Sequence, residues 1–269
     1  MKRGKKISLS YFIEQVRGGW SDWRWWYFQF TNQVLMLYFS FKKNKGDYVL
    51  NEGWDNLILL DACRFDLFQE KIEGTGLVGF LEKRVSRGSS TADFLLENFE
   101  GRNLDDIIYI TSNPYVQTML NNPFYKTVNL WLDEWDNNLG TVHPKQVAKA
   151  AIEAHMKHPD KRLIVHFMQP HCPFIGEYTK EGNFWQIALG EGREEVMKAY
   201  GSNLDFVLPY VKKLLGKLRG KSIVSSDHGN ACGEKVLFFP VYGHPKRMRI
   251  PALVDVPWFI VTGVENELH

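Results

Sequence analysis

Two kinds of apolar pattern alternate along this chain. Continuous apolar runs are typical of strands buried on both faces of a parallel sheet, and runs with apolar residues every three or four positions are typical of helices. The first kind predicts strands near residues 57–61, 107–111, 163–168, 222–226 and 257–262. The second predicts helices near residues 65–72, 91–99, 144–157 and 193–218. The alternation indicates an α/β fold, a three-layer αβα sandwich with a mostly parallel central sheet.

The first fifty residues do not follow this pattern. Aromatic side chains crowd residues 20–30, and an apolar run follows at residues 34–41. Interspersed polar residues make the stretch too polar to predict a transmembrane span, and it lacks the apolar core and cleavage site of a signal peptide. We therefore expect an aromatic-rich helical extension over residues 1–50 and one larger domain over residues 51–269. The helix would either pack on that domain or a second subunit, or lie at a membrane interface through residues 11–45.

Composition narrows the function classes. With 269 residues, 44% of them apolar, the chain can bury the core of one large domain. The net charge of +2 does not call for a nucleic-acid partner. Three cysteines, an odd number, and the missing signal peptide indicate a reducing compartment. We thus expect a cytoplasmic protein, peripheral on the inner face of a membrane if the interfacial interpretation of the helix is right.

Polar residues with metal-binding chemistry follow two of the predicted strands. Asp227 and His228 stand side by side after residues 222–226, and Gly229 allows a sharp turn there. Asp61 ends the run 57–61. Because open α/β sheets bind ligands at the carboxyl ends of their strands, these side chains are candidates for a metal site. The alternatives are an ordinary Asp-His-Gly turn and a helix cap at Asp61.

Two further segments carry nucleophile and histidine candidates. Ser89, Ser90 and Thr91 precede a helical pattern, so one hydroxyl caps the helix and a second would lie over its positive end. His171 lies between two prolines after another predicted strand, where a stiff loop suits a ligand. His166, within that strand, is interpreted as a hydrogen-bonded core residue.

Together these segments resemble the alkaline phosphatase superfamily, in its sulfatase-like and phosphoglycerol-transferase-like branch. D-A-C-R-F-D resembles the sulfatase D-D-L-R-P-D, and S-S-D-H-G-N resembles T-S-D-H-G. M-Q-P-H-C-P-F resembles the H-x-P-F loop of lipoteichoic-acid synthases, and G-S-S-T-A-D-F the nucleophile loop of the phosphoglycerol transferases. The resemblance spans about residues 55–263 in the expected order.

The resemblance implies a role for each matching residue. One divalent metal would be bound by Asp61, Asp227 and His228. Ser89 would be the nucleophile and touch the same metal, or Thr91 if the alignment shifts by one gap. The remaining candidates would bind the substrate oxyanion, a second metal or developing charge: His171, His244, Arg64 and Arg87. Zn or Mn is the expected metal, with Ca or Mg as alternatives, and one or two ions.

Two departures from the sulfatase pattern shape the predicted function. The chain has no C-x-P-S-R motif for a formylglycine, and Ala62 replaces the second Asp of D-D. We therefore predict a metal-dependent hydrolase or transferase that acts on phosphate esters, including glycan- or lipid-linked ones, through a covalent phospho-enzyme. The alternatives are a sulfatase-like enzyme without formylglycine, an inactive member that binds a phosphorylated or sulfated glycan, and a membrane-associated interaction protein. A homo-oligomer stays open.

Overall fold

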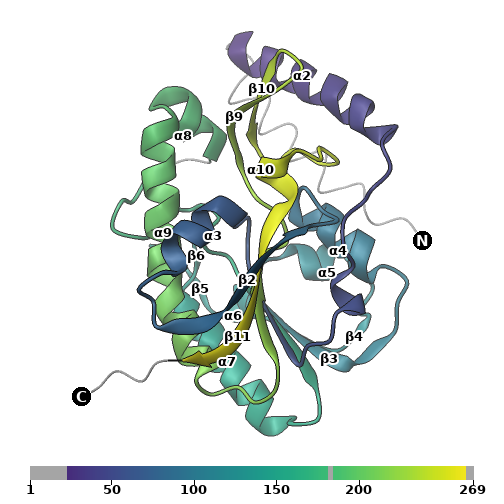
Figure 1. The fold of residues 1–269 in the computed structure, drawn as a ribbon, viewed down its shortest axis with the longest axis vertical. Coiled ribbons are helices and arrows are strands. Elements are labelled where there is room, and N and C mark those ends of the chain that lie inside the picture. Colours follow the sequence, from purple (N-terminus) through teal and green to yellow (C-terminus); the bar gives the residue numbers. More distant parts are fainter. Residues whose placement is uncertain (1–22, 181–183, 265–269) are drawn as a thin grey trace.

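The structure is a computed structural model that describes residues 23–180 and 184–264. A seven-stranded sheet forms the centre of the molecule. Its strand order is β2-β11-β8-β1-β7-β3-β4 (Figure 1). The strands are β1 (Asn56–Leu60), β2 (Leu77–Val85), β3 (Leu104–Thr111), β4 (Phe124–Asn129), β7 (Arg162–Phe167), β8 (Ser222–Ser225) and β11 (Asp255–Val264). The five strands from β8 to β4 are parallel, and β11 runs antiparallel to both β8 and β2.

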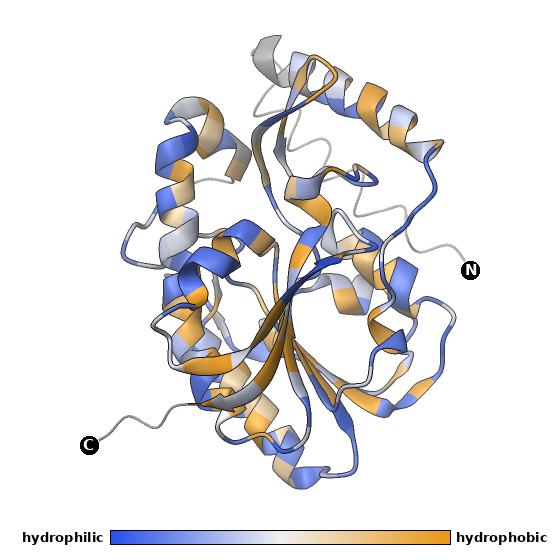
Figure 2. Cartoon of the chain, in the orientation of Figure 1, coloured by the Kyte–Doolittle hydropathy of each residue, from blue (hydrophilic) through white to orange (hydrophobic). Residues whose placement is uncertain are grey.

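Helices cover both faces of the sheet, so the fold has the three predicted layers. On one face α3 (Phe65–Ile72), α7 (Pro144–Lys157) and α9 (Arg193–Leu215) pack against side chains such as Ile58 and Val165. On the other face α4 (Thr91–Phe99) and α5 (Tyr115–Met119) pack against Leu57 and Ile164. The sheet buries both faces because alternate residues of β1 point into the two opposite cores, and Figure 2 shows these strands as mostly apolar.

Shorter elements lie in the connections and beyond the sheet. They are η1 (Val49–Asn51), α6 (Leu130–Asp133), β5 (Trp135–Asp136), β6 (Thr141–Val142), α8 (Phe184–Gly190), β9 (Ala231–Val236), β10 (Phe239–Gly243) and α10 (Pro251–Val254). Strands β9 and β10 form an antiparallel hairpin that leaves the sheet directly after β8. Figure 1 shows this hairpin rising from the edge of the sheet where the parallel strands end.

The predicted helices and strands are confirmed, and the sheet has two strands more than expected. The three helices expected at residues 65–72, 91–99 and 144–157 have these bounds, and the fourth ends at Leu215 rather than at residue 218. Strands β2 and β4 were not predicted. Strand β2 is an edge strand on which only Leu77 is buried. Its second half carries the charged residues Glu82, Lys83 and Arg84, so it lacks the apolar run of a central strand.

Helix α2 (Trp23–Ser40) forms the described part of the N-terminal extension. Thr31, Leu35 and Phe39 recur every four residues and are buried, the two apolar ones against the hairpin and α10. The helix therefore packs on the larger domain, one of the two interpretations of the sequence. Trp20 and residues 11–22 of the expected membrane contact lie outside the described residues. Among the helices of residues 23–180 and 184–264, none combines the length and apolar character that crossing a membrane requires.

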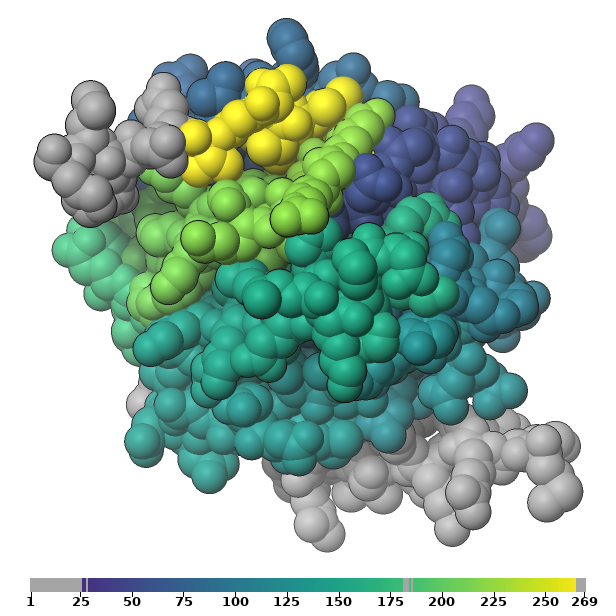
Figure 3. Space-filling model, turned by 90° about the horizontal axis from the view of Figure 1, so that it is seen from below, coloured from purple at the N-terminus to yellow at the C-terminus, as the bar shows by residue number. Residues whose placement is uncertain are grey.

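The two ends of the sheet differ. Helix α2 and the β9–β10 hairpin lie beyond the carboxyl ends of the parallel strands (Figure 1). Seen from the opposite end, the surface is formed by the teal to yellow-green connections that lead into β7 and β8, beside the yellow β11 (Figure 3). The carboxyl edge, where Asp61 and Asp227 follow their strands, is thus the edge on which α2 and the hairpin sit.

Candidate active site

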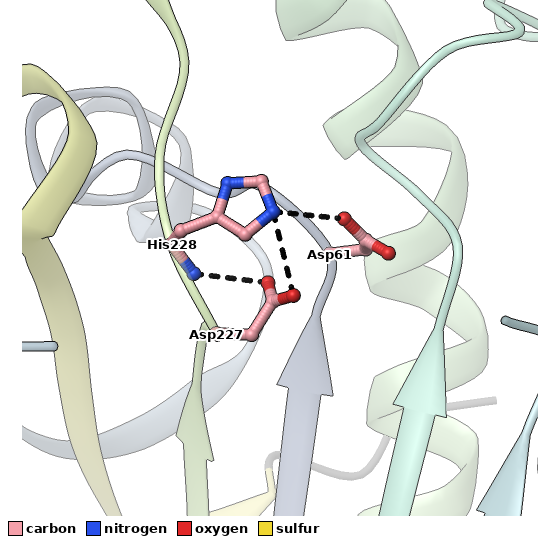
Figure 4. Close-up of side chains that lie close together, drawn as sticks. All are labelled: Asp61, Asp227 and His228. Atoms are coloured by element: carbon pink, nitrogen blue, oxygen red, sulfur yellow. Dashed lines mark hydrogen bonds and ion pairs between the residues drawn. The ribbon is translucent and has the colours of Figure 1, made fainter. Parts of the chain in front are cut away.

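Asp61, Asp227 and His228 lie together at the carboxyl edge of the sheet (Figure 4). Strands β1 and β8 are parallel neighbours, so the residues that follow them emerge side by side. The Nε2 atom of His228 lies 3.6 Å from Asp61 Oδ1 and 3.5 Å from Asp227 Oδ2. All three side chains are fully buried. The strand-end pattern in the sequence therefore predicts this cluster correctly in space.

The donor atoms of this cluster fit a divalent metal. Asp61 Oδ1 and Asp227 Oδ2 are buried and have no hydrogen-bond partner. Such atoms are costly unless something else binds them. Zinc–ligand distances near 2.1 Å place neighbouring ligands of a tetrahedron about 3.4 Å apart, close to the separations around His228 Nε2. The residues present thus match the donor set that a metal ion needs.

Charge at the cluster also favours a cation. Burial raises the pKa of Asp61 well above its usual value, and the neighbouring carboxylate of Asp227 raises it further. Burial would raise the pKa of Asp227 as well, but His228 and His166 lower it below its usual value. Burial lowers the pKa of His228, which leaves its imidazole neutral and able to offer a lone pair. A divalent ion would offset the mutual repulsion of the two carboxylates.

Two site residues were not singled out by the sequence pattern. Asn113 follows β3, and its Nδ2 donates a 2.6 Å hydrogen bond to Asp61 Oδ2. In β7, the Nδ1 atom of His166 is hydrogen-bonded to the hydroxyl of Tyr109, at 3.0 Å. Its Nε2 has no hydrogen-bond partner and lies 3.6 Å from Asp61 Oδ2 and 3.7 Å from Asp227 Oδ2. His166 is thus hydrogen-bonded, as expected, but it also faces the cluster.

The structure brings Thr91 to the cluster rather than Ser89. Thr91 is the first residue of α4, and its Oγ1 lies 3.3 Å from His228 Nε2. Ser90 caps the helix by accepting from the Asp93 backbone N–H at 3.3 Å. The Ser89 hydroxyl instead donates to Pro245 O at 2.8 Å and accepts from the backbone N–H of Met248 at 3.1 Å. Ser89 therefore holds the chain that follows His244.

His171 and His244 lie between the buried cluster and the surface. Their Nε2 atoms are 3.0 Å apart, and the ring of His244 lies 4.7 Å from that of His228, centroid to centroid. Burial would lower the pKa of His171, but Cys172 and Asp61 raise it to about 10. Burial and the two neighbouring histidines hold the pKa of His244 well below its usual value. His171 thus donates the hydrogen bond that His244 accepts.

The loop that carries His171 is held by one buried side chain of α9. The Nδ2 atom of Asn203 lies 3.1 Å from Pro170 O and 2.9 Å from His171 O. Its Oδ1 accepts from the backbone N–H of Ile175 at 3.0 Å. Asn203 is fully buried, so these bonds replace contacts with water and fix the loop. The sequence placed a stiff loop here from its prolines alone.

The two arginines expected to balance charge make ion pairs with nearby carboxylates. Arg64 binds Asp66 through two nitrogens, at 2.8 and 2.6 Å, and Glu234 through a third, at 2.7 Å. Arg87 binds Glu97 at 2.7 Å and stacks on the ring of Tyr48. Both guanidinium groups are occupied by partners that tie elements together. Their role in balancing charge on the substrate stays a prediction.

The cysteines do not join the Asp61 cluster. Cys63 and Cys232 are buried in the core beneath α3 and α9. Cys172 lies on the rim, with Sγ 3.6 Å from His171 Nδ1. Burial would raise the pKa of the Cys172 thiol, but His171 lowers it. Of the three cysteines, Cys172 is therefore the one beside a candidate site histidine.

Comparison with solved structures identifies the fold. No protein-family model and no curated protein matches the sequence. The soluble domain of lipooligosaccharide phosphoethanolamine transferase A from Neisseria meningitidis is similar, with a TM-score of 0.52 at 15% identity over 77% of this chain and 75% of that chain. The chain has the alkaline phosphatase-like fold. This confirms, at the level of the fold, the resemblance seen in the sequence motifs.

Two further solved structures are similar to this chain. The integral membrane form of the same Neisseria meningitidis transferase matches with a TM-score of 0.51 at 14% identity, over 94% of this chain and 59% of that chain. The C-terminal periplasmic domain of a Campylobacter jejuni phosphoethanolamine transferase matches with a TM-score of 0.49 at 15% identity, over 76% of this chain and 77% of that chain. The expected cytoplasmic location is corrected by the first of these two matches, because that transferase is an integral membrane protein.

Proposed function

We propose that this protein is a metal-dependent enzyme that transfers or hydrolyses phosphate esters, with Thr91 as the nucleophile. The observation that carries the proposal is the position of the Thr91 hydroxyl, at the start of α4, beside the buried cluster of Asp61, Asp227 and His228. One oxygen of each carboxylate in this cluster has no hydrogen-bond partner. The fold neighbours support the class, since two of them are phosphoethanolamine transferase structures. The sulfate-ester alternative is disfavoured by the missing formylglycine motif and by Ala62.

The metal would be held by Asp61, Asp227, His228 and Thr91. His166 would be a further donor, because its Nε2 faces Asp61 Oδ2 and Asp227 Oδ2. Zinc suits these N and O ligands, and manganese is the alternative. When bound, the ion supplies Lewis acidity to the Thr91 hydroxyl and to the phosphoryl oxygen. The backbone orients the ligands as well, because the Ala62 N–H donates to Asp227 Oδ1 at 3.0 Å.

The nucleophilic step uses residues whose positions are known. Thr91 Oγ1 forms a bond to phosphorus while the bond from phosphorus to the leaving oxygen breaks, and the threonine proton passes to solvent. His171 is protonated at neutral pH and lies on the rim, so its positive charge stabilises the phosphoryl oxygens, and the leaving oxygen takes a proton from solvent. Water or an alcohol then attacks phosphorus and gives its proton to solvent, while the bond from phosphorus to Thr91 Oγ1 breaks and Thr91 takes up a proton from solvent. His244 accepts from His171 and fixes its ring.

The test compares variants that separate the hydroxyl from the metal. Thr91→Val keeps the side-chain shape and should lower turnover of p-nitrophenyl phosphate or its bis ester about a thousandfold or more. It should keep its metal, measured by elemental mass spectrometry. Thr91→Ser should retain turnover, and Ser89→Ala should retain it at a temperature where that variant is folded. Asp227→Asn should lose both metal and turnover.

A phosphorylated peptide provides the direct readout of the nucleophile. Brief reaction and acid quenching should trap phosphate on Thr91, located by peptide mass spectrometry. Phosphate on Ser89, with activity retained in Thr91→Val, would reject the nucleophile proposed here. A protein that binds no metal and turns over no phosphate ester would instead be the inactive, ligand-binding member.

A further inference from the structure

Helix α2 has an apolar face that the described residues, 23–180 and 184–264, do not cover. Thr31, Leu35 and Phe39 form its buried stripe, whereas Phe30 and Leu37 on other sides of the helix are 66% and 62% exposed. The helix is apolar nearly all round, which is typical of a helix buried on more than one side. A soluble surface rarely carries large apolar side chains in such density without a partner. This face is therefore expected to contact something outside the chain.

The tip of the β9–β10 hairpin continues this face. Leu237 and Phe238 form the turn and are 61% and 90% exposed. The hairpin lies beside α2, because Phe239 contacts the ring of Tyr27 at 6.4 Å between centroids (Figure 1). Apolar residues run along α2 and over the hairpin tip in Figure 2.

The backbone of the hairpin turn supports a role for its side chains. Leu237 has a φ of 55°, in the left-handed region that favours Gly or Asn over leucine. A turn chosen for stability alone would have a glycine or asparagine there. The leucine and the neighbouring phenylalanine instead present two large apolar groups to the outside.

The exposed charges of α2, of the segment that follows it and of the hairpin tip are basic. Residues 23–46 contain four Lys or Arg and no Asp or Glu, and residues 235–250 contain another four and again no acidic residue. Lys42, Lys43, Lys45, Lys235, Lys246 and Arg247 are exposed. An aromatic, apolar face bordered by basic side chains complements the interface of an anionic lipid bilayer, where rings sit at headgroup level and lysines meet lipid phosphates.

We infer that α2 and the hairpin tip form a docking surface for an anionic lipid bilayer. The hairpin begins three residues after His228 and ends next to His244, so docking would bring the carboxyl edge of the sheet close to the headgroups. The inference rests on the exposed residues and their charge and does not depend on the reaction proposed for Thr91.

Vesicle flotation tests this surface with the full-length protein. We expect the protein to float with vesicles of phosphatidylcholine and phosphatidylglycerol, and to bind vesicles of phosphatidylcholine alone about tenfold or more weakly. Phe238→Ser combined with Phe41→Ser should lower binding at least about tenfold, since Phe41 is 84% exposed and neither ring is needed for the core. Lys42→Glu combined with Lys43→Glu should reduce binding to the anionic vesicles by a similar factor.

Matched controls keep the result specific. Phe80→Ser removes an equally large ring, 68% exposed, from the edge strand β2 and should leave binding unchanged. Lys145→Glu with Lys149→Glu reverses two exposed charges on α7 and should also leave it unchanged. Asp227→Asn should float like the natural protein, which separates docking from the chemistry of the site. Thermal unfolding verifies that each variant is folded.

Several results would overturn the inference. One is a natural protein that floats with neither kind of vesicle. Another is binding that the Phe41 and Phe238 pair does not change, or that falls as much in the Phe80 variant. A third is a dimer, seen by light scattering without lipid, that the Phe41 and Phe238 pair dissociates, because the face would then join two copies of the chain.

Discussion

At the scale of single residues, Asn113 holds Asp61 in place for the cluster. Its amide binds Asp61 Oδ2 at 2.6 Å, and this leaves Oδ1 to face His228. Hydrogen bonds of this kind orient metal ligands and typically contribute 10- to 100-fold to metal affinity, as a rough range. Asn113→Ala should therefore weaken binding of Zn or Mn by about this factor, measured by competition with a chromogenic chelator.

The control for Asn113 is a surface pair of the same chemistry. Asn103 donates a 2.8 Å hydrogen bond to the exposed Asp105, and Asn103→Ala should not change metal affinity. Unchanged affinity in Asn113→Ala would mean that Asp61 is oriented by the fold alone, or that no metal binds there.

The same residues show how far the sequence defines the site. Asp61, Asp227 and His228 could be predicted because each directly follows an apolar run, and parallel strand ends meet at one edge. The proximity of Asn113 to Asp61 could not be predicted, since it depends on which strands are neighbours. Nor could the sequence choose Thr91 over Ser89, because that choice depends on the residue at which α4 begins.

At the scale of elements, Arg64 joins the start of α3 to the β9–β10 hairpin and to the residue before it. It connects the start of α3, through Asp66, to β9 of the hairpin, through Glu234 and the Asn230 carbonyl. Burial alone would raise the pKa of Glu234, but the hydrogen bond and charge of Arg64 lower it below its usual value. The bridge fixes the hairpin next to the loop that carries His228.

This lowered pKa gives a stability that depends on pH with a definite sign. A carboxyl whose folded pKa lies below its unfolded pKa stabilises the fold above the unfolded value, and this contribution disappears as the pH falls through the folded value. Glu234→Gln should therefore lower the free energy of unfolding by about 1 kcal/mol at neutral pH, since the pair is partly exposed. The difference from the natural protein should shrink to zero in acid.

Urea unfolding followed by circular dichroism at several pH values measures this difference. Glu153→Gln is the control, because Glu153 makes an exposed pair with Lys149 at 3.9 Å and should have no effect at any pH. A Glu234→Gln difference that stays constant down to acid pH would show that the lost interaction is packing or hydrogen bonding rather than charge.

The sequence predicted the buried helices and the central strands, and it missed the two edge strands and the hairpin. Buried helices and central strands have strong apolar periodicity, and residues 65–72 and 144–157 are helical as predicted. Strands β2 and β4 lie at the two edges of the sheet, where one side is exposed and the pattern is mixed. The hairpin escaped prediction because its turn is Leu237-Phe238 and lacks the Gly or Asn that announces a turn.

At the scale of the whole molecule, the candidate metal centre affects the stability of the fold. Asp61 and Asp227 are both fully buried, and burial and Asp227 raise the pKa of Asp61. The candidate site also lies where β1, β7 and β8 end and where α4 begins, so its residues come from four elements. An ion bound there would neutralise the carboxylates and connect these elements, whereas its removal would leave uncompensated buried groups.

We therefore expect chelation to destabilise the protein. A ligand at one hundred times its Kd stabilises the folded state by about 2.7 kcal/mol, which corresponds to roughly 5–10 °C in a chain of this size. Differential scanning fluorimetry should show this drop in EDTA and its reversal by Zn or Mn. Asp227→Asn should unfold at one temperature in both conditions, whereas Asp205→Asn, on exposed α9 surface, should keep the full shift. A natural protein with equal midpoints in EDTA and in excess metal would show that no ion binds the Asp61 cluster.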